Sequence, residues 1–350
     1  MTGVTGLGRW PGSDVREAQA VVVGDLTSAP EGVEGLPFAV NPVDRGPWAG
    51  PIGRAAALLV DMSTELGVHG WMFADRPGRD LDRARAAVRE DLDALAVAAY
   101  EYAGRLVVPV IGPVTLAATL YLARGDRVLA DSGALRALGE SLGAGVAAHV
   151  GRVRGLVPSA QVVVVLDEVD LVAALRGAVP SFSGRTTLRP VPPPVAAEML
   201  RGVLDSVRSG SGSQPVVEVV VDVGAAWTTV GTVVSAGADG VVLAVGQTDR
   251  QGWDRVAETV EGGVALWAAI PGRREARTRA TATAGAEVQA RVLTEPWRQV
   301  GLPASRLAEV VLVAESATSR GTPAPEMGRA RQDLADLLDV ARLLAEAAAR

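Results

Sequence analysis

The chain contains no cysteine and no lysine among its 350 residues, and its only histidines are His69 and His149. Without cysteine it can form neither a disulfide nor a thiolate nucleophile. Without lysine it cannot form a Schiff base on a side chain. A zinc site of the usual Cys/His kind needs more ligands than two histidines, so carboxylates would have to complete it. Thiolate and Schiff-base catalysis are therefore excluded, and a zinc site is possible only with carboxylate ligands.

Clustered positive charge is missing as well. All 34 basic residues are arginine, the formal net charge is −6, and no basic stripe follows the chain. Nucleic acid is therefore not an expected partner, because phosphate binding needs clustered cations. No basic segment followed by an apolar run opens the chain, and runs such as Gln161–Leu166 are too short to span a bilayer. We expect a soluble, cytoplasmic protein with no membrane partner.

The chain does contain short β-branched runs that alternate with longer segments rich in Ala, Leu and Arg. Continuous apolar runs are typical of strands buried on both faces of a parallel sheet. Their alternation with helical segments favours right-handed βαβ units, and eight such units predict an α/β fold, a single (β/α)8 TIM barrel over residues 1–350. The expected strands are Gly3–Leu7, Val68–Phe73, Leu106–Val110, Gln161–Leu166, Val216–Val221, Gly240–Val245, Val264–Ile270 and Val310–Val313.

Two stretches interrupt this alternation. Residues 27–53 are rich in Gly and Pro and lack periodicity, which predicts a long loop after the first strand and helix. Residues 209–213 read Ser-Gly-Ser-Gly-Ser, which predicts a flexible connector at a helix-to-strand junction. We interpret this connector as a tether inside one domain.

In a barrel, functional groups gather at the carboxyl ends of the strands and in the loops that follow. The Gly-rich turn over residues 5–12 follows the first expected strand; its glycines let backbone approach a ligand, and Arg9 would bind a carboxylate with both guanidinium nitrogens. The alternative is a tight turn with an exposed arginine. Residues 111–116, Ile-Gly-Pro-Val-Thr-Leu, would offer backbone N–H groups to an anion, or form an ordinary turn and helix start.

Asp167 and Glu168 follow directly on a strand that is expected to be buried. Burying charge is costly without a partner, so a carboxylate pair at this place favours a ligand ammonium group or general acid–base work. The alternative is a cap on the next helix. His69 lies near the second expected strand, and we interpret His149, between alanines on a long helix, as structural.

The order of these motifs resembles a known family. Residues 6–12, 75–80, 112–116 and 166–168 are similar, in order and spacing, to short stand-alone homologues of the catalytic half of cobalamin-independent methionine synthase. That family shares a barrel superfamily with uroporphyrinogen decarboxylase. The resemblance spans nearly the whole chain, and Gly-Pro-Val-Thr-Leu and Asp-Glu are its more specific elements.

The resemblance implies an activity in methionine biosynthesis, in which zinc binds homocysteine as thiolate and a folate supplies the methyl group. It places the amino-acid part of homocysteine at Gly8, Arg9 and Asp167, with Glu168 adjoining. Arg9 departs from the family's serine and replaces a small hydroxyl with a bulky cation. Further residues expected at the barrel rim are Trp10, Thr115, Glu315 and Ser316.

The family's zinc ligands have no counterpart. The His-x-Cys positions fall near Val221 and Val223, and the later cysteine falls at Ser316. Valine cannot ligate a metal through its side chain, and a neutral hydroxyl is a poor substitute for thiolate. We therefore expect no zinc and no other cofactor.

The sequence thus predicts a methionine synthase-like barrel in which zinc-dependent methyl transfer is altered or lost, with a pocket for a homocysteine-like amino acid or a pterin such as folate. Three alternatives stay open. One is an active methyltransferase of changed chemistry that uses Arg9, Asp167, Glu168 and Glu315. The others are a non-catalytic binding or regulatory protein, and a metal-free decarboxylase-like enzyme that sets Arg and Asp against an acidic tetrapyrrole.

Overall fold

Parallel strands form the centre of the molecule. The computed structural model describes residues 1–210, 217–272, 285–315 and 326–349. In this part of the chain an 8-stranded sheet runs in the order β3-β1-β12-β11-β10-β9-β8-β7, and every neighbouring pair is parallel. The strands are β1 (Thr2–Thr5), β3 (Val33–Gly35), β7 (Arg105–Ile111), β8 (Gln161–Asp167), β9 (Glu218–Asp222), β10 (Gly240–Ala244), β11 (Ala265–Ile270) and β12 (Val311–Ala314).

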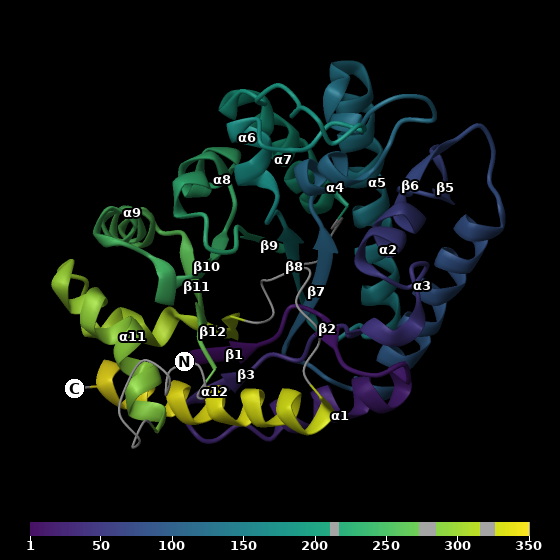
Figure 1. Ribbon diagram of the computed structural model, residues 1–350. Helices are drawn as coiled ribbons and strands as arrows, with labels where there is room; N and C mark the ends of the chain where they lie inside the picture. Colours follow the sequence, from purple (N-terminus) through teal and green to yellow (C-terminus); the bar gives the residue numbers. More distant parts are fainter. Residues whose placement is uncertain (211–216, 273–284, 316–325, 350) are drawn as a thin grey trace.

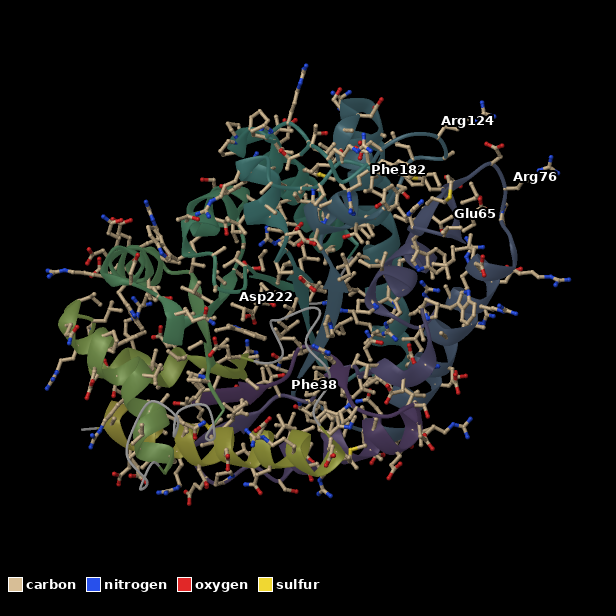
Figure 2. All side chains as sticks on the ribbon, viewed as in Figure 1. Phe38, Glu65, Arg76, Arg124, Phe182 and Asp222 are labelled. Atoms are coloured by element: carbon tan, nitrogen blue, oxygen red, sulfur yellow. The ribbon has the colours of Figure 1, made fainter. Side chains whose placement is uncertain are left out.

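The two edge strands of this sheet, β3 and β7, meet through the residues that follow β3. Phe38 and Val107 form a parallel bridge. The N–H of Ala39 donates to the carbonyl of Val107, and the N–H of Val107 donates to the carbonyl of Pro37, both at 2.8 Å. Phe38 is fully buried, and Figure 2 shows it well inside the fold. The sheet therefore curls back on itself, and the predicted α/β barrel is confirmed.

Helices surround the curled sheet (Figure 1). The Asp14 carboxylate accepts hydrogen bonds from the N–H groups of Arg16 and Glu17 and so caps the first helix, as expected for an acidic residue at that position. The helices are α1 (Val15–Thr27), α2 (Pro51–Leu58), α3 (Arg79–Ala98), α4 (Pro113–Thr119), α5 (Ser132–Leu156), α6 (Leu171–Arg176), α7 (Pro193–Ser209), α8 (Val230–Ala236), α9 (Arg250–Glu261), α11 (Ala286–Gln299) and α12 (Met327–Ala348). In the described ranges no helix combines the length and the apolarity that crossing a membrane requires.

Most of the expected strands coincide with strands of the barrel because their side chains are buried on both faces. Every residue of β10 is buried, and so are Val162–Leu166 in β8. Such strands need an unbroken apolar run instead of an alternating one. The pattern was therefore sufficient to find β1, β7, β8, β9, β10, β11 and β12.

The second expected strand is wrong. Residues 68–73 belong to an antiparallel hairpin of β5 (Ser63–Gly67) and β6 (Gly70–Ala74), whose turn leaves Val68 98% exposed. The second barrel strand is β3, inside the stretch that was expected to be a long loop. That stretch also contains β4 (Asn41–Pro42), which pairs with β2 (Arg9–Trp10), and the start of α2. Most of the connector expected over residues 209–213 lies outside the described residues.

The short helix α2 lies directly against α5. Gly145 of α5 makes this close approach possible, because a Cβ built there would lie 1.9 Å from the backbone carbonyl oxygen of Leu58 at the end of α2. Gly151, further along α5, is exposed, and a Cβ there would meet nothing within 4 Å. The same helix therefore offers a matched pair of glycines.

We predict that Gly145→Ala lowers the free energy of unfolding by about 1–3 kcal/mol, because the methyl group would push against backbone that cannot move aside easily. Gly151→Ala should raise it by about 0.5–1 kcal/mol, because alanine is the better helix former. Urea unfolding followed by circular dichroism measures both. Equal effects of the two substitutions would contradict the close packing of α2 on α5.

Candidate functional site

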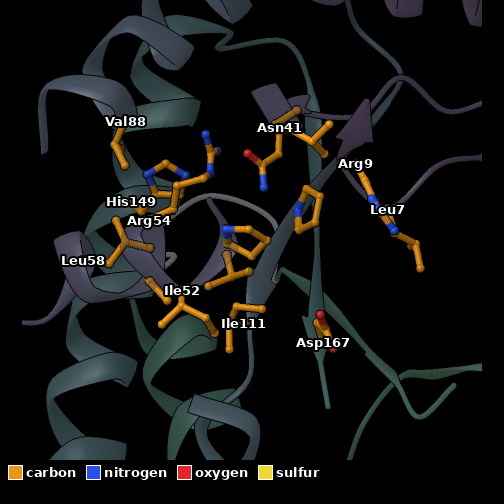
Figure 3. Close-up of a pocket in the computed structure, with 17 residues that line it drawn as sticks. Leu7, Arg9, Asn41, Ile52, Arg54, Leu58, Val88, Ile111, His149 and Asp167 are labelled. Carbon is orange, nitrogen blue, oxygen red and sulfur yellow. The ribbon is translucent and has the colours of Figure 1, made fainter. Parts of the chain in front are cut away.

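A cavity of about 300 Å³ opens at the carboxyl ends of β1, β7 and β8 and reaches helices α2, α3 and α5 (Figure 3). Its walls are mostly apolar, with Ile52 and Leu58 from α2 and Val110 and Ile111 from β7. This volume is at the lower end of the range of about 300–1,000 Å³ typical of small-molecule sites. Five polar side chains also line the cavity: Arg9, Asn41, Arg54, His149 and Asp167.

Two of these polar residues, Arg9 and Asp167, are predicted site residues that the fold brings to one cavity. Arg9 belongs to β2, just after β1, and Asp167 is the last residue of β8. Gly8 also lines the cavity. Its φ is +89°, and a Cβ there would lie 2.7 Å from the Pro109 ring, so glycine lets this turn lie directly on β7.

The Asp167 side chain is half-buried and held by backbone. Its Oδ1 accepts a hydrogen bond from the N–H of Val169 at 3.2 Å. In the sheet Asp167 pairs with Ile111 on β7 and with Asp222 on β9. Arg9 is also half-buried, and this burial lowers the pKa of its guanidinium from its usual value.

Glu168, the second predicted carboxylate, has a different environment. It is fully buried, and its two oxygens accept hydrogen bonds from the N–H groups of Val114 at 2.8 Å and Thr115 at 2.7 Å. Burial raises the pKa of Glu168 to about 8, against the opposing effect of these hydrogen bonds. For the N–H groups at the start of α4 the sequence left two alternatives, a bound anion or an ordinary turn and helix start; in the structure a carboxyl group of the protein itself accepts from them.

This contact also explains the glycine of the turn. A Cβ on Gly112 would lie 2.4 Å from Oε1 of Glu168, so only glycine leaves room for the carboxylate. Glu168 is not among the residues that line the cavity. Its hydrogen bonds connect the end of β8 to the start of α4. Of the two neighbouring carboxyl groups, only that of Asp167 lines the cavity.

The residues expected at the rim have mixed positions. Trp10 is only 3% exposed, and its Nε1 donates to the sulfur of Met327, the first residue of α12, at 3.2 Å. Thr115 is fully buried, and its hydroxyl accepts from the N–H of Asp170 at 3.1 Å. Glu315, just after β12, accepts a hydrogen bond from Gln247. Ser316 lies outside the described residues.

Sequence reasoning did not assign Asn41, Arg54 or His149 to the site, yet all three line the cavity. The Arg54 guanidinium forms an ion pair with Asp91, which also pairs with Arg45. Burial, and then the neighbouring Arg45, lowers the pKa of Arg54 to about 10. One weak signal was present in the sequence: Arg54 is the single charge in the otherwise uncharged helix Pro51–Leu58.

His149 is buried in α5, with 6% of its surface exposed. Burial lowers the pKa of its imidazole to about 3, and the charges of Arg54 and Arg152 add to the effect. The side chain is therefore neutral at any physiological pH. Its interpretation as purely structural is incomplete, because it also forms part of the cavity wall.

Two of the three positions that the resemblance gives to zinc ligands are buried valines, and the third, Ser316, lies outside the described residues. Val221 and Val223 are buried at the end of β9, at 0% and 1% exposure. The carboxylate between them, Asp222, accepts from the N–H of Gly224 at 2.8 Å and lies near the centre of the view in Figure 2. In the described part of the chain no group of three or more His, Cys, Asp or Glu side chains is arranged to hold a metal. At the two family ligand positions that the structure describes, the side chains cannot ligate a metal.

Comparisons with known proteins give only distant likenesses. No protein-family model and no curated protein matches the chain. Among solved structures, a B12-independent methionine synthase from a Shewanella species, in complex with selenomethionine, matches with 12% identity and a TM-score of 0.47. The match covers 73% of this chain and 66% of that chain, just under two thirds of its length.

Mandelate oxidase structures match over more of the chain but less closely. A mandelate oxidase variant with benzaldehyde has 15% identity and a TM-score of 0.28 over 95% of this chain and 90% of that chain. Mandelate oxidase with benzoyl-formic acid has 14% identity and a TM-score of 0.27 over the same shares. Likenesses at this level say nothing about the ligand of this chain.

The buried carboxyl of Glu168 predicts a pH dependence of stability. Because its pKa is raised from 4.5 to about 8 in the fold, the folded state holds the proton more tightly than the unfolded state. Its contribution is complete below the unfolded pKa and is lost as pH rises through about 8. The free energy of unfolding should therefore fall between about pH 5 and about pH 8.

Glu168→Gln should remove this fall, because the amide does not ionise in this range. At about pH 5 it should also cost about 1–3 kcal/mol, since its NH2 group would face two backbone donors. Urea unfolding at several pH values tests this, with Glu261→Gln at the exposed end of α9 as the control. Parallel pH curves for the wild type and Glu168→Gln would contradict the assignment.

Proposed function

We propose that this chain is a methionine synthase-like barrel protein that binds a small amino-acid-like ligand and has lost or altered zinc-dependent methyl transfer. The observation that carries the proposal is the position of Arg9 and Asp167 on one cavity at the carboxyl ends of β1 and β8. This is the end of a (β/α)8 barrel at which active and binding sites lie.

The two side chains suit the two charges of an amino acid. The planar guanidinium of Arg9 would bind the ligand carboxylate through two parallel hydrogen bonds. The carboxylate of Asp167, oriented by the N–H of Val169, would accept from the ligand ammonium group. The apolar wall of Ile52, Val110 and Ile111 would then receive the side chain of the ligand. Of the amino acid and the pterin that the resemblance implies, these opposite charges favour the amino acid.

The geometry favours binding over acid–base catalysis by the carboxylate pair. Asp167 lines the cavity, whereas Glu168, which would complete the pair, is buried against the start of α4. A general acid or base must come within hydrogen-bond reach of the reacting proton. Asp167 would therefore bind the ligand, whereas Glu168 stabilises the contact between β8 and α4.

We predict that Asp167→Asn weakens the binding of L-homocysteine about tenfold to a hundredfold, because it removes a charge-assisted hydrogen bond to the ammonium group. Isothermal titration calorimetry measures the affinity, and thermal unfolding monitors the fold. Asp205→Asn, at an exposed position of α7, is the matched control and should change neither. An unchanged affinity together with a lowered melting temperature would show that Asp167 only holds the N–H of Val169.

We also predict that the purified protein carries no stoichiometric zinc and forms no methionine from homocysteine and a folate donor. A catalytic zinc needs about three protein ligands and an open position, and Val221 and Val223 supply none. Elemental analysis after dialysis against a chelator tests the metal, and an assay for methionine tests the activity. About one zinc per chain, with methionine formation that stops when the metal is removed, would overturn the proposal of lost zinc chemistry.

A further inference from the structure

A second cavity, of about 470 Å³, opens at the same end of the barrel as the cavity lined by Arg9 and Asp167, which we call the first cavity. It lies among the segments that follow β8, β9 and β10, and no described residue lines both cavities. Asp167 at the end of β8 lines the first cavity, and Val169 lines the second. The end of β8 therefore separates two cavities at the barrel mouth, the place where such barrels bind ligands.

Each of the three segments contributes apolar side chains to the wall of the second cavity. They are Val169 and Val172 after β8, Val223 after β9, and Ala244 at the end of β10. Val223 is also one of the positions to which the resemblance assigns a zinc ligand, and valine cannot ligate a metal. A ligand of this cavity therefore has to be recognised by apolar contacts, by the backbone and by the polar side chains of the wall.

Trp227 gives the second cavity an aromatic side chain. It lies after β9, lines the cavity and is half-buried. Gly252, in the first turn of α9, lets the indole lie directly against this helix, because a Cβ there would be 2.8 Å from Cγ of Trp227. The side chain of Asp249 accepts from the N–H of Gly252 at 2.8 Å and so fixes the same turn. The indole is therefore held in place without a ligand, and aromatic rings of this kind pack well on other planar rings.

Arg176, the last residue of α6, is the only charged residue among the described residues that line the second cavity. Its side chain is exposed, and no described residue forms a hydrogen bond or an ion pair with it. The amide of Gln247, which also lines the cavity, donates to Glu315, and Glu315 does not line it. The described wall thus has a cation without a counter-ion, and an anionic ligand would supply one.

We propose that the second cavity is a binding site for a small aromatic carboxylate. The guanidinium of Arg176 would bind the carboxylate through two parallel hydrogen bonds. The ring would pack against Trp227 and the valine side chains of the wall. This inference is independent of the proposed function, because none of its residues lines the first cavity.

The charge of the described wall favours a carboxylate over a phosphate group. A phosphate monoester carries close to two negative charges and three acceptor oxygens at neutral pH. One arginine would match only part of that charge, and the rest would lose hydration without a counter-ion. A carboxylate carries one charge and two oxygens, which a single guanidinium matches in full.

The test compares three probes on the full chain: benzoate, benzamide, which has the ring without the charge, and acetate, which has the charge without the ring. Ligand-observed NMR titrations should show benzoate binding about tenfold more tightly than either of the others. Arg176→Gln should weaken benzoate about tenfold and leave benzamide unchanged, whereas Trp227→Leu should weaken both alike. Arg136→Gln, at an exposed position of α5, is the matched control and should change neither affinity. Thermal unfolding should show that Arg176→Gln keeps the stability of the wild type.

Four outcomes would overturn the inference. Benzoate and benzamide would bind equally to the wild type, or no binding of benzoate would be detected. The preference for benzoate would survive Arg176→Gln. Benzoate binding would be lost in Arg9→Gln and unchanged in Arg176→Gln, which would assign it to the first cavity. Inorganic phosphate would displace benzoate at an equal concentration, which would make the cavity a general anion site.

Discussion

The seam between β3 and β7 determines where the cavity can form. The chain after β3 is held to β7 by the bridge of Phe38 with Val107, and the N–H of Ala39 still donates to β7. At Asn41 it has changed partner, because the N–H of Asn41 donates to Gly8 in the turn after β1. Beyond Val107, β7 therefore has no described ladder partner on this side. Its last residues, Pro109–Ile111, become a wall of the cavity.

Asp167 and Glu168, at the carboxyl end of β8, have different environments because their side chains point in opposite directions. In an extended strand successive side chains point to opposite faces of the sheet. Asp167 at the end of β8 therefore reaches the cavity, while the following residue, Glu168, turns to the start of α4. The carboxyl group of Glu168 is hydrogen-bonded to the start of α4. Helix α5, which contacts α4, carries His149, and His149 lines the same cavity. The ligand site and the helix contact thus depend on one strand end.

The sequence predicted those elements whose physical requirements restrict the types of side chain that can be used. Strands buried on both faces need unbroken apolar runs, so β8 and β10 were visible. Polar residues directly after such runs identified Asp167 and Arg9 as neighbours at the barrel mouth. By contrast, β3 is only Val-Glu-Gly, and its place in the barrel depends on backbone pairing that leaves no apolar pattern. Its glycine is needed because a Cβ would lie 1.9 Å from the carbonyl of Leu26, a contact no periodicity reveals.

The contribution of Asn41, Arg54 and His149 to the cavity could not be predicted for a related reason. His149 lies among small residues on a long amphipathic helix, and its neighbours in space, Arg54 and Asn41, are about a hundred residues earlier in the chain. The packing of α2 on α5, which Gly145 permits, brings Arg54 to His149, and the pairing of β4 with β2 places Asn41 at the same cavity. The role of Glu168 was hidden in the same way, because a cap on the following helix and a contact with the preceding α4 look alike in sequence.

The barrel mouth is divided between two halves of different character. Around β1, β7 and β8 it carries a mostly apolar cavity that is also lined by two arginines, Arg9 and Arg54, and by the carboxylate of Asp167. At the end of β9, where the resemblance places the first metal ligands, Val221 is buried in the core, and Val223, although buried, contributes to the wall of the second cavity, of about 470 Å³. Placing Arg9 and Asp167 on a mostly apolar cavity has a desolvation cost, which the interactions that each side chain makes within the protein reduce.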